Sequence, residues 1–342
     1  MSNLETPKNL GSAINALKSW ASQDPSLWNT GLSPKGALLA QRIASELILT
    51  GSVPIFEPPP HTVIWCAANV FTAPLEWVVQ LTANGGKVTL KAPSKAPESA
   101  EAIANAFSSL GVAVHISPIS ESWGLLSGAD AVIGFGGTAS MASLSAHIGP
   151  HIANSLHGHR VSFAVVDTDV TDPKIVADAL ALDLILYDGR GCMSPVAIFT
   201  LGSQVERFAD ELSEALQAAE RQVPRGGLAP REGAEWRRKT GLARILGRCI
   251  EGDHWAVTIL PIDYFEPHTQ PRLACLYKVE SPEAILRAIN GLPLSTCGTN
   301  LSGQSLRAAG FSRICPLGKM QTPPLNRLHD GTDVLKEISG ES

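Results

Sequence analysis

Short apolar segments alternate with helical segments through the first half of the chain, and this alternation constrains the fold more than any other feature of the sequence. Parallel strands separated by helices of this length form βαβ units with right-handed crossovers. A strand as apolar as Ala131-Val132-Ile133 suits a sheet that helices cover on both faces. We therefore expect an α/β fold. The expected strands are residues 62–67, 87–90, 112–116 and 131–135, and the expected helices are residues 74–83, 97–110 and 138–148.

The alternation continues beyond this first block. Residues 161–167 and 197–201 are further strand candidates, and two amphipathic helices over residues 13–21 and 36–49 precede the alternation. A chain of 342 residues is too long for one small hydrophobic core. We therefore expect a second α/β unit.

Composition narrows the class of protein. With 44% hydrophobic and 17% charged residues the chain is expected to fold, and its net charge of −5 argues against nucleic acid as the main partner. The most apolar window, residues 61–83, is interrupted by Asn69, Pro74 and Glu76, so we expect no membrane span. Six single cysteines without a CxxC pair fit neither the common zinc spacings nor a disulfide framework. Together with a polar N-terminus lacking a signal-peptide pattern, they indicate a cytoplasmic protein without a bound metal.

One cysteine lies in a segment that predicts a sharp turn. Asp188-Gly189-Arg190-Gly191-Cys192-Met193-Ser194-Pro195 separates two apolar runs, and its glycines and Ser-Pro pair are typical of turns. Such a turn can surround the sulfur of Cys192 with backbone N–H groups, which favour the nucleophilic thiolate. A small apolar residue that merely fills a tight loop fits this segment equally well.

Polar groups follow three of the expected strands. The run from Gly134 to Ser140 opens a helix where a dinucleotide pyrophosphate would bind, although its spacing is not GxGxxG and a plain tight turn fits as well. Lys91, Ser94 and Lys95 follow another strand and can bind a ribose and its 2′-phosphate. Asn69 closes a third strand, where its amide either donates to an oxyanion or caps a turn.

Residues 221–248 are strongly basic, with eight basic and two acidic side chains on a net-acidic chain. A solvated loop and helix face is the ordinary explanation for such a run. The functional alternative is a landing surface for coenzyme phosphates or for an acidic carrier protein. The spacing does not separate the two.

Taken in order, several motifs of the chain resemble one known family. They are Cys66-Ala67-Ala68-Asn69-Val70-Phe71, Lys91-Ala92-Pro93-Ser94-Lys95-Ala96-Pro97, Gly136-Gly137-Thr138, His157-Gly158-His159-Arg160, the turn around Cys192, Pro316-Leu317-Gly318-Lys319-Met320 and His329-Asp330-Gly331. The set resembles the acyl-CoA reductase family typified by the fatty-acid reductase of bacterial bioluminescence, a branch of the aldehyde dehydrogenase superfamily. The resemblance runs from about residue 60 to about residue 335.

The resemblance implies a fold and roles for individual residues. The fold would be aldehyde-dehydrogenase-like, with a Rossmann-like cofactor domain over residues 1–160, completed by residues 317–342, and an α/β catalytic domain over residues 161–316. Cys192 would take the acyl group from a thioester, and Asn69 would form the oxyanion hole with the Cys192 backbone N–H. A cation at Lys95 would favour a 2′-phosphate and hence NADPH. The implied cofactor residues are Lys91, Ser94 and Lys95 for the ribose and Gly136, Gly137 and Thr138 for the phosphates.

The chain also departs from the aldehyde dehydrogenase pattern. Leu156 stands where those enzymes carry the glutamate that activates water, so an acyl-enzyme should deacylate poorly to acid. His157 or His159 could act as an acid–base partner beside that position, or either could simply be a packing or surface histidine. Gln270-Pro271-Arg272-Leu273 replaces the segment that contacts the nicotinamide ribose.

The implied function is NADPH-dependent reduction of an acyl-CoA or acyl-carrier thioester to an aldehyde through an acyl-cysteine. Two alternatives remain open. One is an NAD(P)-dependent aldehyde dehydrogenase running oxidatively with a histidine as base. The other is a non-catalytic carrier-binding subunit that docks an acidic carrier protein on residues 221–248. Dimers are common in the superfamily, so a homodimer is compatible with the resemblance.

Overall fold

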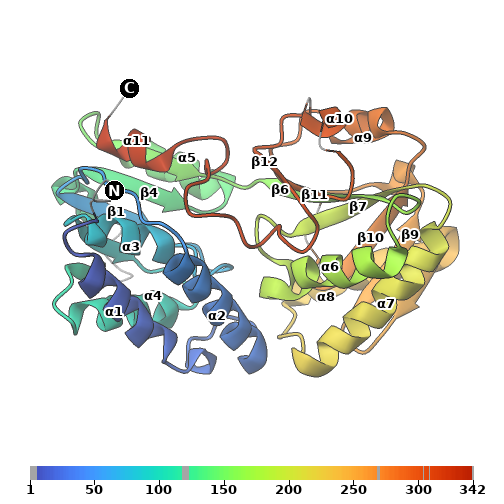
Figure 1. The fold of residues 1–342 in the computed structure, drawn as a ribbon, viewed down its shortest axis with the longest axis horizontal. Helices are drawn as coiled ribbons and strands as arrows, with labels where there is room; N and C mark the ends of the chain where they lie inside the picture. Colours follow the sequence, from blue (N-terminus) through green and yellow to red (C-terminus); the bar gives the residue numbers. More distant parts are fainter. Residues whose placement is uncertain (1–5, 118–122, 268–269, 303, 308, 341–342) are drawn as a thin grey trace, which may run out of the picture. The chain divides into compact units, whose positions relative to one another are not determined.

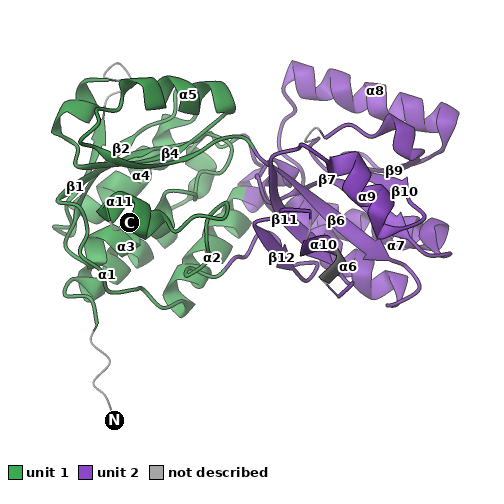
Figure 2. Cartoon of the chain, turned by 90° about the horizontal axis from the view of Figure 1, so that it is seen from above, with its two compact units in different colours: residues 1–30, 37–159, 324–342 green, residues 31–36, 160–323 purple. Residues whose placement is uncertain are grey.

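The computed structural model describes residues 6–117, 123–267, 270–302, 304–307 and 309–340. Figure 1 draws its helices and strands and labels most of them. The chain divides into two compact units, which Figure 2 distinguishes by colour. Unit 1 consists of residues 1–30, 37–159 and 324–342, and unit 2 consists of residues 31–36 and 160–323. Among the residues described here, no helix is both long enough and apolar enough to cross a membrane.

Unit 1 is built on a five-stranded parallel sheet of order β3-β2-β1-β4-β5. Helix α1 packs on α3 and α4, whereas α5 and α11 pack against β4 and β5. The strands are β1 (His61–Trp65), β2 (Lys87–Lys91), β3 (Val114–Ser117), β4 (Ala131–Phe135) and β5 (Ala153–His157). The helices are α1 (Leu10–Ala21), α2 (Pro34–Thr50), α3 (Leu75–Ala83), α4 (Pro97–Ser108), α5 (Thr138–His147) and α11 (Val334–Ser339), with the short 3-10 helices η1 (Pro25–Leu27) and η2 (Gly124–Gly128).

The sequence prediction for this unit is confirmed for four strands and their helices, with boundaries that differ by a few residues. Strand β5 was not predicted. It reads Ala-Asn-Ser-Leu-His, so it lacks the apolar run that identified the other strands. The side chains of Ser155 and His157 in this strand bind the C-terminal segment.

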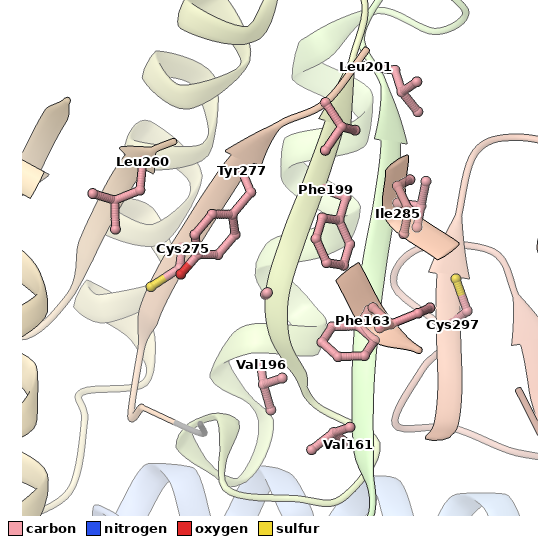
Figure 3. Packing of buried hydrophobic residues seen from close by; sticks show 14 of the residues in the cluster. Val161, Phe163, Val196, Phe199, Leu201, Leu260, Cys275, Tyr277, Ile285 and Cys297 are labelled. Atoms are coloured by element: carbon pink, nitrogen blue, oxygen red, sulfur yellow. The ribbon is translucent and has the colours of Figure 1, made fainter. Parts of the chain in front are cut away.

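Unit 2 contains a seven-stranded sheet of order β12-β11-β6-β7-β10-β9-β8, parallel except for β8, which runs antiparallel to β9. Phe163, Phe199 and Tyr277 come from three neighbouring strands and pack together in its core (Figure 3). The strands are β6 (Val161–Asp167), β7 (Pro195–Leu201), β8 (Arg248–Glu251), β9 (Ala256–Leu260), β10 (Leu273–Lys278), β11 (Leu294–Thr299) and β12 (Arg313–Cys315). The helices are α6 (Pro173–Ile185), α7 (Val205–Gln222), α8 (Pro230–Leu246), α9 (Pro282–Ile289) and α10 (Gln304–Arg307), with η3 (Leu186–Gly189) and η4 (Ile262–Tyr264).

The chain returns from unit 2 to unit 1 at Pro324, later than the expected position at residue 317. The reason is the buried carboxylate of Asp183 on α6. It accepts hydrogen bonds from the backbone N–H groups of Gly318, at 2.6 Å, and Met320, at 3.0 Å. These bonds attach the turn that follows β12 to unit 2.

Candidate active site

The turn that carries Cys192, residues 189–194, lies between η3 and β7 in unit 2. The N–H of Ser194 donates to the carbonyl of Gly191 at 3.0 Å, which closes a β-turn with Cys192 and Met193 at its centre. Cys192 itself is exposed. Its carbonyl accepts a hydrogen bond of 2.6 Å from the hydroxyl of Ser162 on β6. The backbone around the sulfur is therefore fixed while the residue remains accessible.

The approach to this turn is conformationally strained. Tyr187 and Asp188 both have a left-handed φ of 54°, which costs a residue with a side chain about 1–2 kcal/mol. Tertiary contacts of Asp188 hold this conformation. Its carboxylate accepts from the Nε of buried Arg272 at 2.8 Å and from the backbone N–H of Gly226 at 3.0 Å, and Arg190 lies 3.2 Å away.

A second set of contacts approaches the turn from the segment after β12. The amide of buried Gln321 donates to the carbonyls of Asp183 and Leu186, at 3.3 and 3.4 Å, and to the hydroxyl of Ser194. A Cβ at Gly191 would lie only 2.9 Å from the side-chain oxygen of Gln321, so any larger residue there would have to displace the Gln321 side chain. Gln321, the residue that follows the Pro316 to Met320 motif, therefore supports the cysteine turn.

The other cysteines differ from Cys192 in exposure. All six lie among the described residues, and Cys192 is the one that is exposed. Burial raises the pKa of the thiols of Cys66 and Cys249 to about 12 and that of Cys315 to about 11. Burial also raises the pKa of Cys275 and Cys297. A protonated, buried thiol is a poor nucleophile, so the geometry singles out Cys192.

In unit 1, four of the motifs gather where the parallel strands end. Trp65, the last residue of β1, pairs in register with Lys91 of β2 and with Gly134 of β4, and Phe135 pairs with His157. The carboxyl ends of these strands therefore share one edge of the sheet, which is where open α/β sheets bind ligands. Exposed Asn69, Ser94 and Lys95 lie in the loops that follow β1 and β2.

Two features of this edge fit an anionic cofactor. The ammonium of Lys91 lies 4.9 Å from the centroid of the Trp65 ring, a cation–π contact that fixes its position. Helix α5 begins after exposed Gly137, which offers no side-chain cap, and a Cβ built there meets nothing within 4 Å. Among the described residues, no side chain caps the N-terminal amides of α5, and a phosphate is a group that such amides bind.

His157 is buried at the end of β5, and both of its ring nitrogens are engaged. Nδ1 lies 3.3 Å from the carboxylate of Asp330, and Nε2 lies 3.0 Å from the hydroxyl of Ser155, which in turn donates to Glu337 on α11. His329 stacks edge-on against the His157 ring at 4.2 Å. These contacts fasten the C-terminal segment to β5. His159, the other histidine of the motif, is exposed.

Comparison with known proteins identifies the family. A family model described as Acyl-CoA reductase (LuxC) matches residues 56–340. The chain belongs to this family. Among curated proteins, the long-chain acyl-protein thioester reductase 2 of Photobacterium leiognathi is 25% identical over 305 residues, which are 82% of this chain and 63% of that protein. The long-chain acyl-protein thioester reductase of Aliivibrio fischeri is 21% identical, over 68% of this chain and 52% of that protein.

This acyl-CoA reductase family member thus spans between about half and two thirds of the length of those relatives. Among solved structures, a succinate-semialdehyde dehydrogenase from Burkholderia pseudomallei superposes with a TM-score of 0.69 at 16% identity, over 92% of this chain and 78% of that one. A gamma-glutamyl-gamma-aminobutyraldehyde dehydrogenase from Burkholderia cenocepacia gives 0.70 at 13% identity, over 92% and 76%. The predicted aldehyde-dehydrogenase-like fold is confirmed.

Half of the basic side chains in residues 221–248 form ion pairs within unit 2. These are four of the eight, and their partners are all carboxylates of the same unit. The paired residues are Arg238 with Glu235 and Glu266, Lys239 with Glu266, Arg244 with Glu251, and Arg248 with Glu206 and Asp210. Internal pairing accounts for much of the charge that made this segment conspicuous.

Asp183 gives the protein a testable pH dependence. Burial raises the pKa of its carboxyl to about 6, even though backbone N–H groups donate to it. The folded protein binds this proton more tightly than the unfolded chain, so stability is present at low pH and is lost as pH rises through about 4 to 6. We expect the stability of the wild type relative to Asp183→Asn to fall by about 2 kcal/mol between pH 4 and 7. Urea unfolding of both proteins measures it, and a difference independent of pH would contradict the assignment.

Proposed function

We propose that this chain reduces an acyl thioester to an aldehyde through an acyl-enzyme at Cys192, with NADPH as the reductant. The observation that carries the proposal is that Cys192 is the exposed one of the six cysteines and lies on a turn that a hydrogen bond from Ser162 holds in place. The chain that carries it belongs to an acyl-CoA reductase family. The names of the curated relatives support a thioester as substrate.

The proposed first step is acyl transfer to sulfur. The Cys192 thiolate attacks the thioester carbonyl carbon, and the carbonyl electrons move onto oxygen. We assign the stabilisation of this oxyanion to the side-chain amide of Asn69 and the backbone N–H of Cys192. When the oxyanion collapses, the C–S bond to the leaving thiol breaks, and that thiolate takes a proton from water.

The cofactor site is proposed at the carboxyl edge of the unit 1 sheet. The amides at Gly137 and Thr138 and the ammonium of Lys91 would hold its phosphates and ribose, and a nicotinamide cofactor supplies a hydride when bound. Leu156, beside His157 on β5, offers no carboxylate to activate water. The acyl-cysteine would therefore survive long enough to be reduced rather than hydrolysed.

Lys95 is the residue proposed to select NADPH over NADH. It is exposed after β2, and a contact between its ammonium and a 2′-phosphate should contribute about 1 kcal/mol or slightly more. We expect Lys95→Ala to raise the dissociation constant for NADPH about fivefold to tenfold and to leave that for NADH within about twofold. Lys87→Ala, an exposed lysine at the opposite end of β2, is the matched control. Equal losses of affinity for NADPH and NADH would contradict a contact between Lys95 and the 2′-phosphate.

The function itself is tested by intact mass. The protein is incubated with a panel of acyl-CoA and acyl-carrier thioesters, and NADPH is then added. We expect a mass gain of one acyl group that disappears with NADPH while aldehyde forms. Acylation that decays to acid without NADPH would instead support the oxidative alternative. Carrier binding without any acylation would support a non-catalytic subunit.

A further inference from the structure

Ser162, a residue outside the family motifs, occupies an unusual place beside the cysteine turn. It lies on β6 between Val161 and Phe163 of the core (Figure 3) and is fully buried. Where β6 passes Ser162, the register of both neighbouring strands shifts. On the β7 side Ser162 pairs with Pro195 but Phe163 pairs with Ala197, so β7 has one extra residue at this point.

The strand on the other side shows the same interruption. Between the pairs Val161–Leu294 and Phe163–Cys297, β11 also has one residue more than β6. A bulge leaves backbone groups without their ladder partners, and bulges are frequent beside active sites, where they redirect the chain. The hydroxyl of Ser162 forms hydrogen bonds toward both neighbouring strands. It accepts from the N–H of Thr296 at 3.0 Å and donates to the carbonyl of Cys192 at 2.6 Å.

The carbonyl that Ser162 binds belongs to the central peptide of the cysteine β-turn. The turn's own hydrogen bond, from Ser194 to Gly191, fixes the outer peptides and leaves the central one, between Cys192 and Met193, able to flip. Neither Cys192 nor Met193 has a positive φ, which excludes a type II turn and its primed relatives. Ser162 therefore holds the peptide in the orientation in which the Cys192 carbonyl points into the unit.

The orientation of that carbonyl determines where an amide points. In a trans peptide the C=O and N–H bonds point in opposite directions, so the N–H of Met193 points away from the buried hydroxyl of Ser162. With negative φ at both central residues, the N–H groups of Cys192 and Met193 have the roughly parallel alignment of a first helical turn. Two adjacent backbone donors are thereby aligned at the exposed nucleophile.

We propose that Ser162 is a positioning residue for the nucleophile, locking the central peptide of the turn so that the Met193 N–H joins the Cys192 N–H as a donor to the oxyanion. This inference rests on the proposed function insofar as the oxyanion is that of a thioester. It needs only that Cys192 attacks a carbonyl, and any activated ester can test that.

The test compares two reactions of the same sulfur. With p-nitrophenyl acetate, the Cys192 thiolate attacks the acetyl carbon through an oxyanion, the bond to the leaving oxygen breaks, and p-nitrophenolate is released as a burst. With iodoacetamide, the thiolate displaces iodide and no oxyanion forms. We expect Ser162→Ala to slow the burst about tenfold, because a misdirected donor loses part of its contribution, and to change alkylation less than about twofold. Cys192→Ser provides the blank for both reactions.

Thr168→Val is the matched control for losing a buried hydroxyl. Thr168 follows the other end of β6, is also fully buried, and likewise donates to a carbonyl, that of Leu201 at 2.9 Å, and accepts from the N–H of Gln204 at 3.1 Å. It should leave the ratio of the two rates unchanged. Met193→Gly is a second, independent variant, because glycine permits the positive φ of a flipped turn, and it should slow the burst selectively as well.

Each outcome decides the inference. If Ser162→Ala slows both reactions equally, the residue merely maintains the fold of the turn and the proposal is wrong. If neither rate changes, the Met193 amide is not a donor. If Ser162→Ala does not fold, a selective loss in Met193→Gly supports the locked peptide and an unchanged burst refutes it. A selective effect with the ester, in a protein that no acyl-CoA acylates, would uphold the inference while removing the proposed function.

Discussion

Replacing Cys192 by serine is expected to abolish acyl-enzyme formation, with a loss of about 10⁴-fold or more in the rate of aldehyde production. Serine preserves the size of the side chain on the braced turn, so the Ser162 and Gln321 contacts should survive. The hydroxyl of the introduced serine, however, stays protonated at neutral pH and is a much weaker nucleophile than a thiolate. The proposed mechanism contains no base that would deprotonate it. Intact mass after incubation with an acyl-CoA, and NADPH consumption, measure the two losses.

Cys249→Ser is the control for this experiment. Cys249 is half-buried on the edge strand β8, and burial together with Glu251 raises the pKa of its thiol to about 12. Its replacement should change acylation less than about twofold. An acyl adduct that persists in Cys192→Ser and is lost in Cys249→Ser would identify Cys249 as the nucleophile and contradict the proposal.

Arg272→Met is expected to destabilise the protein by about 3–5 kcal/mol, because it removes the buried cation that two nearly buried carboxylates share. The Arg272 side chain is 1% exposed. Its guanidinium bonds to Asp188 at 2.8 Å and to Glu220 at 2.7 Å. Both carboxylates are nearly buried, at 2% and 9% exposure, so water cannot replace the lost partner. Urea unfolding of the variant beside the wild type measures the loss.

The effect should extend to the nucleophile. Asp188 has a left-handed backbone that Arg272 helps to hold, so Arg272→Met should also alter the alkylation rate of Cys192 under conditions where the variant is still folded. Arg248→Met is the matched control. Arg248 also contacts two carboxylates, those of Glu206 and Asp210, but its side chain is 38% accessible to solvent and both carboxylates are exposed, so its loss should cost about 1 kcal/mol or less. Equal destabilisation by the two substitutions would contradict the role assigned to burial.

The sequence predicted best those strands that are buried on both faces of the sheet. Strand β4 was predicted with its observed bounds. A short apolar segment between two helices is typical of a parallel-sheet strand that is buried on both faces. Strand β5 was missed because it is polar. Ser155 and His157 are tolerated in the sheet because Glu337 and Asp330, which lie far away in the sequence, bind them. The residues of β5 alone therefore could not indicate that these partners exist.

The residues that brace Cys192 were missed for the same reason. Arg272 was noticed only as a departure from the superfamily pattern, and its partners Asp188 and Glu220 lie 84 and 52 residues away. Ser162 is a polar residue near the start of a mostly apolar strand, and its role depends on register shifts in two neighbouring strands. Local composition predicted the turn. The contacts that hold the turn arise from tertiary structure alone.

The fastening of the C-terminal segment has a consequence for biosynthesis. Strand β5 is synthesised before any strand of unit 2, whereas the groups that bind its side chains, Asp330 and Glu337, follow the last strand of that unit. On the ribosome, β4 and β5 of the first sheet therefore lack the helix α11 that packs on them until the whole second sheet has emerged. Apolar surface that is exposed during folding favours association with another chain. The first unit to begin folding is thus the last to be completed, and a nascent chain is most vulnerable to aggregation during that interval.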